Sequence, residues 1–132
     1  MKLISKTKLL LIEDSENDAL LIVRNLSREI PDLCFKRVDT KKDFEDLMMR
    51  EKDWDLIITD KSLPQFTGPE VIKYIRKRGL PIPIICVSGT DFGDVNQICL
   101  ELGADAFIIK DNFEEITKTA IVLLEEYKNK FV

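Results

Sequence analysis

The chain has 132 residues, about the length of one domain, and 45% of them are hydrophobic and 33% are charged. This balance is typical of a globular protein and excludes a disordered or fibrous chain. A net charge of −4 gives no long-range attraction to nucleic acid or anionic membranes, and no apolar run approaches the roughly 18 residues of a membrane span. We therefore expect one domain over residues 1–132, with its core at about 8–128, no direct nucleic-acid binding and no membrane insertion.

The sequence contains three cysteines and no histidine. The odd number, and the lack of any CxxC spacing, argue against a thiolate metal site and against a disulfide framework. Residues 1–8 lack the long apolar stretch of a signal peptide. These features favour a reduced, cytoplasmic setting.

Five short apolar runs of the kind found in strands alternate with segments of helical periodicity. The runs begin at intervals of 23 to 26 residues, near Leu9, Leu33, Leu56, Ile82 and Ala106. The apolar residues expected on one face of each helix are Ala19, Leu20, Val23, Leu26 and Ile30; Phe44, Leu47 and Met48; Val71, Ile72 and Ile75; Val95, Ile98, Cys99 and Leu102; and Ile116, Ala120, Leu123, Leu124 and Tyr127. This alternation predicts an α/β fold in which five helices cover both faces of a five-stranded parallel sheet.

Helix start and stop signals agree with this division. Gly68, followed by proline and glutamate, is typical of a helix start. Gly79 and Gly103 stand where the third and fourth helices should end. Asn112, with Glu115 three residues later, resembles a capping box before the last helix.

Charged or hydroxylated residues stand where four of the five apolar runs end. Glu13 and Asp14 follow the first run, Asp60 ends the third, Ser88 ends the fourth and Lys110 follows the fifth. The carboxyl ends of parallel strands meet at one edge of a sheet, where ligands bind in such folds. We therefore expect three carboxylates and one ammonium group to converge there.

Such a cluster needs a cation, because closely spaced carboxylates repel one another. Oxygen ligands of this kind suit Mg²⁺. A carboxylate at such a metal can act as a nucleophile toward phosphorus, and a hydroxyl such as that of Ser88 could donate to a phosphoryl oxygen. The simpler interpretation of Asp14 or Ser15 is a helix N-cap, whereas no helix follows Asp60 immediately.

Competing motifs fail on inspection. The chain contains neither GxGxxG nor a P-loop motif. The acidic residues that begin at Asp14 imitate a calcium loop, but Ala19 and Asn25 replace its glycine and its final glutamate. An aspartyl phosphatase would want a second aspartate two residues after Asp60, where Ser62 stands.

The sequence resembles the receiver domain of two-component response regulators, and in particular chemotaxis-type regulators, from about Lys8 to Lys128. The matching segments are 9–18, 60–68, 87–90 and 103–110. The resemblance implies a flavodoxin-like doubly wound sheet with strand order 2-1-3-4-5. It also implies a single receiver domain.

The resemblance implies a role for each acidic residue. Asp60 would be the phosphoacceptor, charged by a sensor histidine kinase or a phosphotransfer protein. Asp14 and Asp60 would bind Mg²⁺ directly, with Mn²⁺ as a possible substitute. Glu13 would act through water, and the backbone carbonyl of Ser62 would be a further ligand. No organic cofactor is implied.

The same resemblance implies a switch. Ser88 and Lys110 would contact the phosphoryl group, and Phe107 matches the aromatic switch position. Phosphorylation would change the face formed by the fourth helix, the fifth strand and the last helix, which would control a downstream protein or a fused output domain. The domain would catalyse only its own phosphoryl transfer and autodephosphorylation.

Two positions bear on the loops of this site. By the same resemblance, Ser62 and Thr90 flank the site at positions that tune loss of the phosphoryl group, and both are small, so we expect water to have access. Asp111 replaces the proline that commonly follows the lysine, so we predict a trans peptide bond after Lys110. Two alternatives remain: a receiver-fold interaction module that is never phosphorylated, and a true phosphohydrolase.

Overall fold

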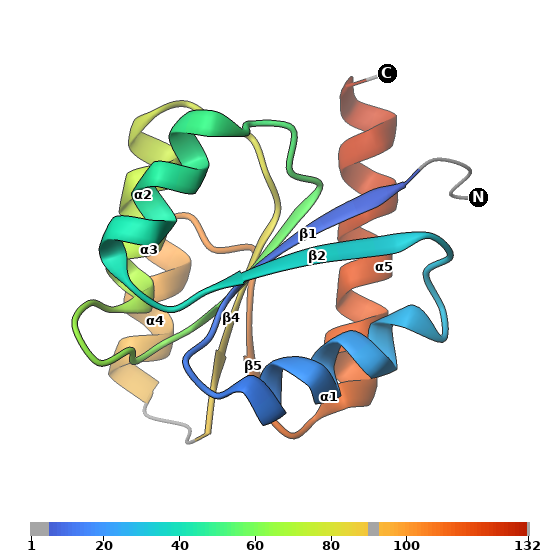
Figure 1. Cartoon of the computed structure of the whole chain (residues 1–132), viewed down its shortest axis with the longest axis horizontal. Helices are drawn as coiled ribbons and strands as arrows, with labels where there is room; N and C mark the ends of the chain where they lie inside the picture. Colours follow the sequence, from blue (N-terminus) through green and yellow to red (C-terminus); the bar gives the residue numbers. More distant parts are fainter. Residues whose placement is uncertain (1–5, 90–92, 132) are drawn as a thin grey trace.

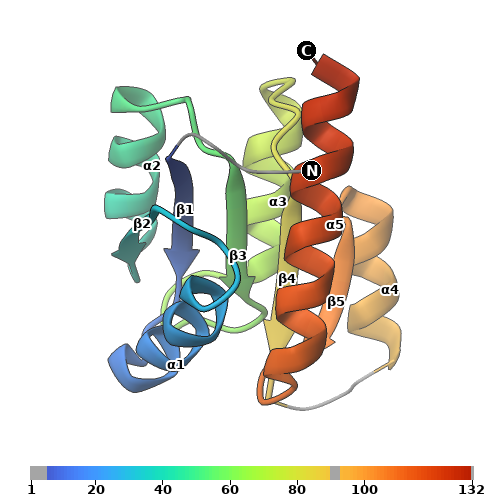
Figure 2. The same ribbon diagram turned by 90° about the vertical axis from the view of Figure 1, so that its right-hand side faces the viewer.

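The computed structural model describes residues 6–89 and 93–131, except the side chains of 93–95 and 128–131. Strands and helices alternate through these residues, in the order β1 Thr7–Ile12, α1 Glu16–Ser27, β2 Leu33–Val38, α2 Lys41–Arg50, β3 Leu56–Asp60, α3 Gly68–Lys77, β4 Ile84–Ser88, α4 Gly93–Leu102, β5 Ala106–Ile109 and α5 Phe113–Phe131. The strands form one parallel sheet (Figure 1), in the order β2-β1-β3-β4-β5, which Figure 2 shows from left to right. The predicted fold class and strand order are therefore confirmed.

The helices lie on the two faces of the sheet. Helices α1 and α5 cover one face, and α2, α3 and α4 cover the other (Figures 1 and 2). Each face has its own hydrophobic cluster, because neighbouring residues of a strand point to opposite sides. Among the described helices, none combines the length and apolarity needed to span a bilayer.

The predicted helix faces are largely confirmed, with two errors. In α1 the buried residues are Ala19, Ile22 and Leu26, whereas Leu20 is 47% exposed. In α4 Cys99 is buried but Ile98 is 46% exposed. In each case the prediction placed two adjacent apolar residues on the buried face, and only one of the two is buried, because helical spacing alone does not fix the edges of that face. The side chain of Val95 lies outside the described residues.

The helix ends show one further correction. The cap of α3 is Thr67 rather than Gly68: the Thr67 hydroxyl accepts from the Glu70 amide, and the Glu70 carboxylate accepts from the Thr67 amide. Gly79 and Gly103 have φ angles of 68° and 118°, so they end α3 and α4 as predicted.

The described cysteines differ in accessibility, which gives a first testable prediction. Cys86 and Cys99 are completely buried, with their sulfur atoms 3.7 Å apart, and burial raises the pKa of both thiols. Cys34 is half-buried at the edge strand. A disulfide reagent should therefore label only Cys34 rapidly in the native protein and all three thiols in urea. Fast labelling of a native Cys34→Ser variant would contradict this.

Candidate functional site

The predicted site residues lie together at the carboxyl edge of the sheet. Glu13 and Asp14 follow β1, Asp60 is the last residue of β3, Ser88 is the last residue of β4, and Lys110 follows β5. The parallel register brings these ends level, because Ile12 pairs with Thr59, Asp60 with Val87 and Ser88 with Ile109. The sheet itself therefore sets the spacing of the site.

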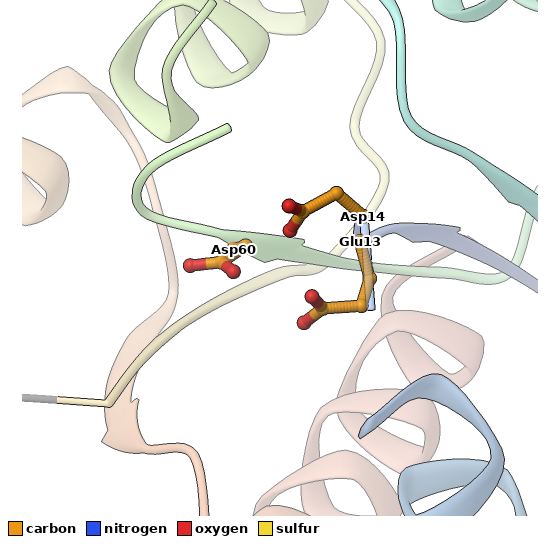
Figure 3. A group of neighbouring side chains, drawn as sticks. All are labelled: Glu13, Asp14 and Asp60. Atoms are coloured by element: carbon orange, nitrogen blue, oxygen red, sulfur yellow. The ribbon is translucent and has the colours of Figure 1, made fainter. Parts of the chain in front are cut away.

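Three carboxylates converge at this edge. Glu13, Asp14 and Asp60 each offer an oxygen atom, and these atoms lie within 4.8 Å of one another. Figure 3 shows the three side chains at the ends of their two neighbouring strands. Glu13 and Asp60 are 1% and 8% exposed, whereas Asp14 is exposed. The cluster therefore has a buried floor and an open side at Asp14.

The Lys110 ammonium lies among the carboxylates. Its Nζ atom is 2.8 Å from Glu13 Oε1, 2.9 Å from Asp60 Oδ2 and 3.1 Å from Asp18 Oδ2. Burial alone would lower the pKa of this ammonium, but hydrogen bonds to the surrounding carboxylates outweigh burial, and the pKa lies above its usual value. Lys110 therefore remains charged and offsets one of the negative charges.

Glu13 is the most buried of the acids. Burial raises the pKa of its carboxyl group, and the charge of Asp60 adds to the effect, against the opposing influence of Lys110 and the Ser15 amide. The Ser15 amide donates to Oε2 at 3.0 Å. Oε1 forms the ion pair with Lys110 but accepts no hydrogen bond of good geometry from the described residues. An incompletely satisfied, buried carboxylate beside two others fits a hard divalent cation.

Main-chain contacts fix the loops that carry these acids. The Ser62 amide donates to Asp60 Oδ1 at 3.2 Å. From β2, the Arg37 guanidinium donates to the Glu13 carbonyl at 3.0 Å. Both loops are therefore held by hydrogen bonds as well as by their strands.

The remaining predicted residues lie at or near the same edge. Ser88 is 3% exposed, and its carbonyl accepts from the Lys110 amide at 2.7 Å. Phe107 is half-buried and packs against the cluster beneath α2, α3 and α4. Ser62 is exposed next to Asp60. Thr90 lies outside the described residues. The peptide bond after Lys110 is trans, as predicted, since the described residues contain no cis bond.

Two residues at the site were not identified from the sequence. Asp18 contacts Lys110 from the first turn of α1, and Lys61, next to Asp60, is only 8% exposed. The signal for Asp18 was its place three residues after Ser15, whose hydroxyl caps the helix by accepting from the Asp18 amide at 3.2 Å. That spacing places Asp18 in the first turn of α1, but it does not fix the direction of its side chain. Lys61 carries no comparable signal.

Comparison with known proteins gives a consistent result. The family model described as the response regulator receiver domain matches residues 9–121. One relative is the alkaline phosphatase synthesis transcriptional regulatory protein PhoP of Bacillus subtilis, which is 35% identical over 106 residues. The match covers 78% of this chain and 42% of PhoP. This chain therefore corresponds to less than half of the length of that relative.

Solved structures share the fold. The signal receiver domain of a LuxO repressor protein from Vibrio parahaemolyticus superposes with a TM-score of 0.83 at 24% identity, covering 96% of this chain and 95% of that one. The Mn²⁺-bound form of the response regulator Rcp1 superposes with a TM-score of 0.71 at 22% identity, covering 86% and 88%.

Proposed function

Because this chain belongs to the response regulator receiver family, whose members are phosphorylation switches of two-component systems, we propose that Asp60 is its phosphoacceptor. The observation that carries the proposal is the position of Asp60. It ends the central strand β3, with Oδ2 at 2.9 Å from Lys110 Nζ and two further carboxylates beside it. No other described carboxylate combines these features.

The same cluster would hold the metal. Asp14 and Asp60 would bind Mg²⁺, or Mn²⁺ in its place, directly; Glu13 would bind it through water, and the Ser62 carbonyl would complete the protein ligands. The all-oxygen donor set and the incompletely satisfied Glu13 Oε1 support this assignment. The Mn²⁺-bound form of Rcp1, a protein of the same fold, agrees with it. When bound, the metal would neutralise charge on the phosphoryl oxygens.

The reaction is a displacement at phosphorus. An oxygen of Asp60 forms the new P–O bond while the bond from phosphorus to the phosphohistidine nitrogen breaks, and that nitrogen keeps the electron pair. Lys110 and Ser88 would contact the transferred group with an ammonium and a hydroxyl. The same residues would support autodephosphorylation, in which water attacks the acyl phosphate, and we expect no turnover of external substrates.

The response would pass from the site to a surface. Ser88 and Phe107 belong to the paired strands β4 and β5, where Phe107 is in register with Cys86. A shift of Ser88 toward the phosphoryl group would change the packing of Phe107 and the face formed by α4, β5 and α5. The helices of this face carry exposed apolar residues, since Ile98 of α4 and Val122 of α5 are 46% and 52% exposed.

Receiver domains interact with histidine kinases and output domains. For this chain the phosphodonor would be a sensor histidine kinase or a phosphotransfer protein, acting in the cytoplasm. The α4–β5–α5 face would control a separate downstream protein or a fused output domain.

The second prediction tests the phosphoacceptor. With Mg²⁺ and acetyl phosphate, the wild-type protein should gain the mass of one phosphoryl group, and Asp60→Asn should gain none. Asp46→Asn, an exposed acid in α2 that pairs with Lys42, should gain it like the wild type. Intact-protein mass spectrometry measures all three. No gain by the wild type at any Mg²⁺ concentration would indicate an unphosphorylated interaction module, and steady phosphate release from unrelated esters would indicate a phosphohydrolase.

A further inference from the structure

Lys110 pairs with a carboxylate outside the metal cluster. Glu13 and Asp60 belong to that cluster, whereas Asp18 does not. Its ammonium carries three N–H groups and lies within 3.1 Å of oxygens from Glu13, Asp60 and Asp18. The ammonium donates hydrogen bonds to Asp60 Oδ2 and Asp18 Oδ2 and forms an ion pair with Glu13 Oε1 before any phosphoryl group arrives. A phosphoryl oxygen must therefore compete with these carboxylates for the ammonium.

The three partners differ in how readily water can replace Lys110. The side chain of Glu13 is 1% exposed, so its release would leave a buried charge unpaired. Asp60 carries the phosphoryl group and stays beside it. Asp18 has a side chain that is 39% exposed, so water can solvate it after release. Asp18 is thus the partner whose loss costs least.

Asp18 also lines a pocket beside the ammonium. This pocket, of about 260 Å³, is lined by Asp18, Leu21, Gly89, Lys110, Asp111 and Phe113. An anionic phosphodonor that enters this pocket meets the carboxylate of Asp18, which both repels it and occupies the ammonium that would receive it. Asp18 therefore opposes phosphorylation in two ways.

We propose that Asp18 is a positioning residue that holds the Lys110 ammonium in the unphosphorylated domain and releases it to the phosphoryl group. This inference rests on the proposed phosphorylation of Asp60. Asp18 thus competes with the phosphoryl group for one cation, and the competition sets how easily the domain is phosphorylated.

Beryllofluoride, a non-covalent phosphoryl mimic, tests the competition at equilibrium in the presence of Mg²⁺. We expect Asp18→Asn to bind it about five-fold more tightly than the wild type, the scale of one partly exposed ion pair. Acetyl phosphate should also phosphorylate this variant faster. Asp18→Glu restores a carboxylate and should return both values to near the wild-type ones.

Glu16→Gln is the matched control. Glu16 is exposed in the same turn of α1, and its substitution removes the same charge. Equal tightening by Glu16→Gln and Asp18→Asn would overturn the inference, because net charge would then explain the effect. Unchanged or weaker binding by Asp18→Asn would overturn it as well.

A structural readout follows the release itself. The NMR signal of Lys110 Nζ should differ between the wild type and Asp18→Asn when both are free. The two signals should coincide when both are saturated with beryllofluoride, because the ion pair between Asp18 and Lys110 is then broken. A difference that persists at saturation would contradict the release. If the wild type binds no beryllofluoride and gains no phosphoryl mass, the proposed function itself fails, which is distinct from failure of the Asp18 competition.

Discussion

Lys110→Met should lower the free energy of unfolding by about 2 kcal/mol in metal-free buffer. Loss of one partner of a fully buried ion pair typically costs about 3–5 kcal/mol, and we expect less here because the Lys110 side chain is 17% exposed. The loss arises because Glu13, with a side chain 1% exposed, loses its ion-pair partner while Asp60 and Asp14 remain beside it. The three acids would then repel one another with nothing between them.

The third prediction is therefore that Mg²⁺ restores most of this loss, since a divalent cation supplies the missing positive charge. Urea unfolding in EDTA and in excess Mg²⁺ measures both effects, and the variant should gain more from Mg²⁺ than the wild type does. Lys118→Met is the matched control, because Lys118 pairs with Glu114 on the surface of α5 with both side chains more than 70% exposed. Its stability should not change measurably. An equal loss in the two variants would contradict the electrostatic interpretation.

The fourth prediction concerns Gly68, where α3 begins against the end of β3. A Cβ atom at this position would lie 2.8 Å from the Asp60 carbonyl oxygen and 3.0 Å from Lys61 Cα. Both neighbours are backbone atoms, so Gly68→Ala must displace the helix or the strand that carries Asp60. We expect a loss of about 2–3 kcal/mol in stability and slower phosphorylation of Asp60.

Thermal or urea unfolding gives the stability, and phosphorylation by acetyl phosphate gives the effect on the site. Gly89→Ala serves as the stability control, because a Cβ atom there meets nothing within 4 Å among the described residues. If Gly68→Ala were as stable as Gly89→Ala, the close approach of α3 to β3 would not constrain the fold.

The sequence was sufficient to place the acidic site because parallel topology determines it. Once residues 9–12, 56–60 and 106–109 are strands of one parallel sheet, their carboxyl ends must meet, and the charged residues there must cluster. The strand order came from the family resemblance rather than from periodicity. The roles of Ser62 and Phe107, and the part of Ser88 in the switch, came from the same source and remain predictions.

The contact between Asp18 and Lys110 could not be predicted in the same way. It joins residues 92 positions apart and depends on the rotation of α1 about its axis and on a long lysine side chain. The inclusion of Leu20 in the buried face of α1, and the omission of Ile22, have a similar origin, because helical spacing does not fix the edges of a buried face. Contacts between a helix and a loop require the packed structure, whereas the meeting of strand ends does not.

Strand β3 has neighbours on both sides and is buried along its whole length. In native-state hydrogen exchange such a strand is typically among the last to open, with terminal segments and edge strands fraying first. An acyl phosphate on Asp60 would therefore be attached to one of the most persistent parts of the fold. Water would reach it through the loops above the sheet rather than through partial unfolding, so the persistence of the signal would depend on those loops and little on the global stability of the domain.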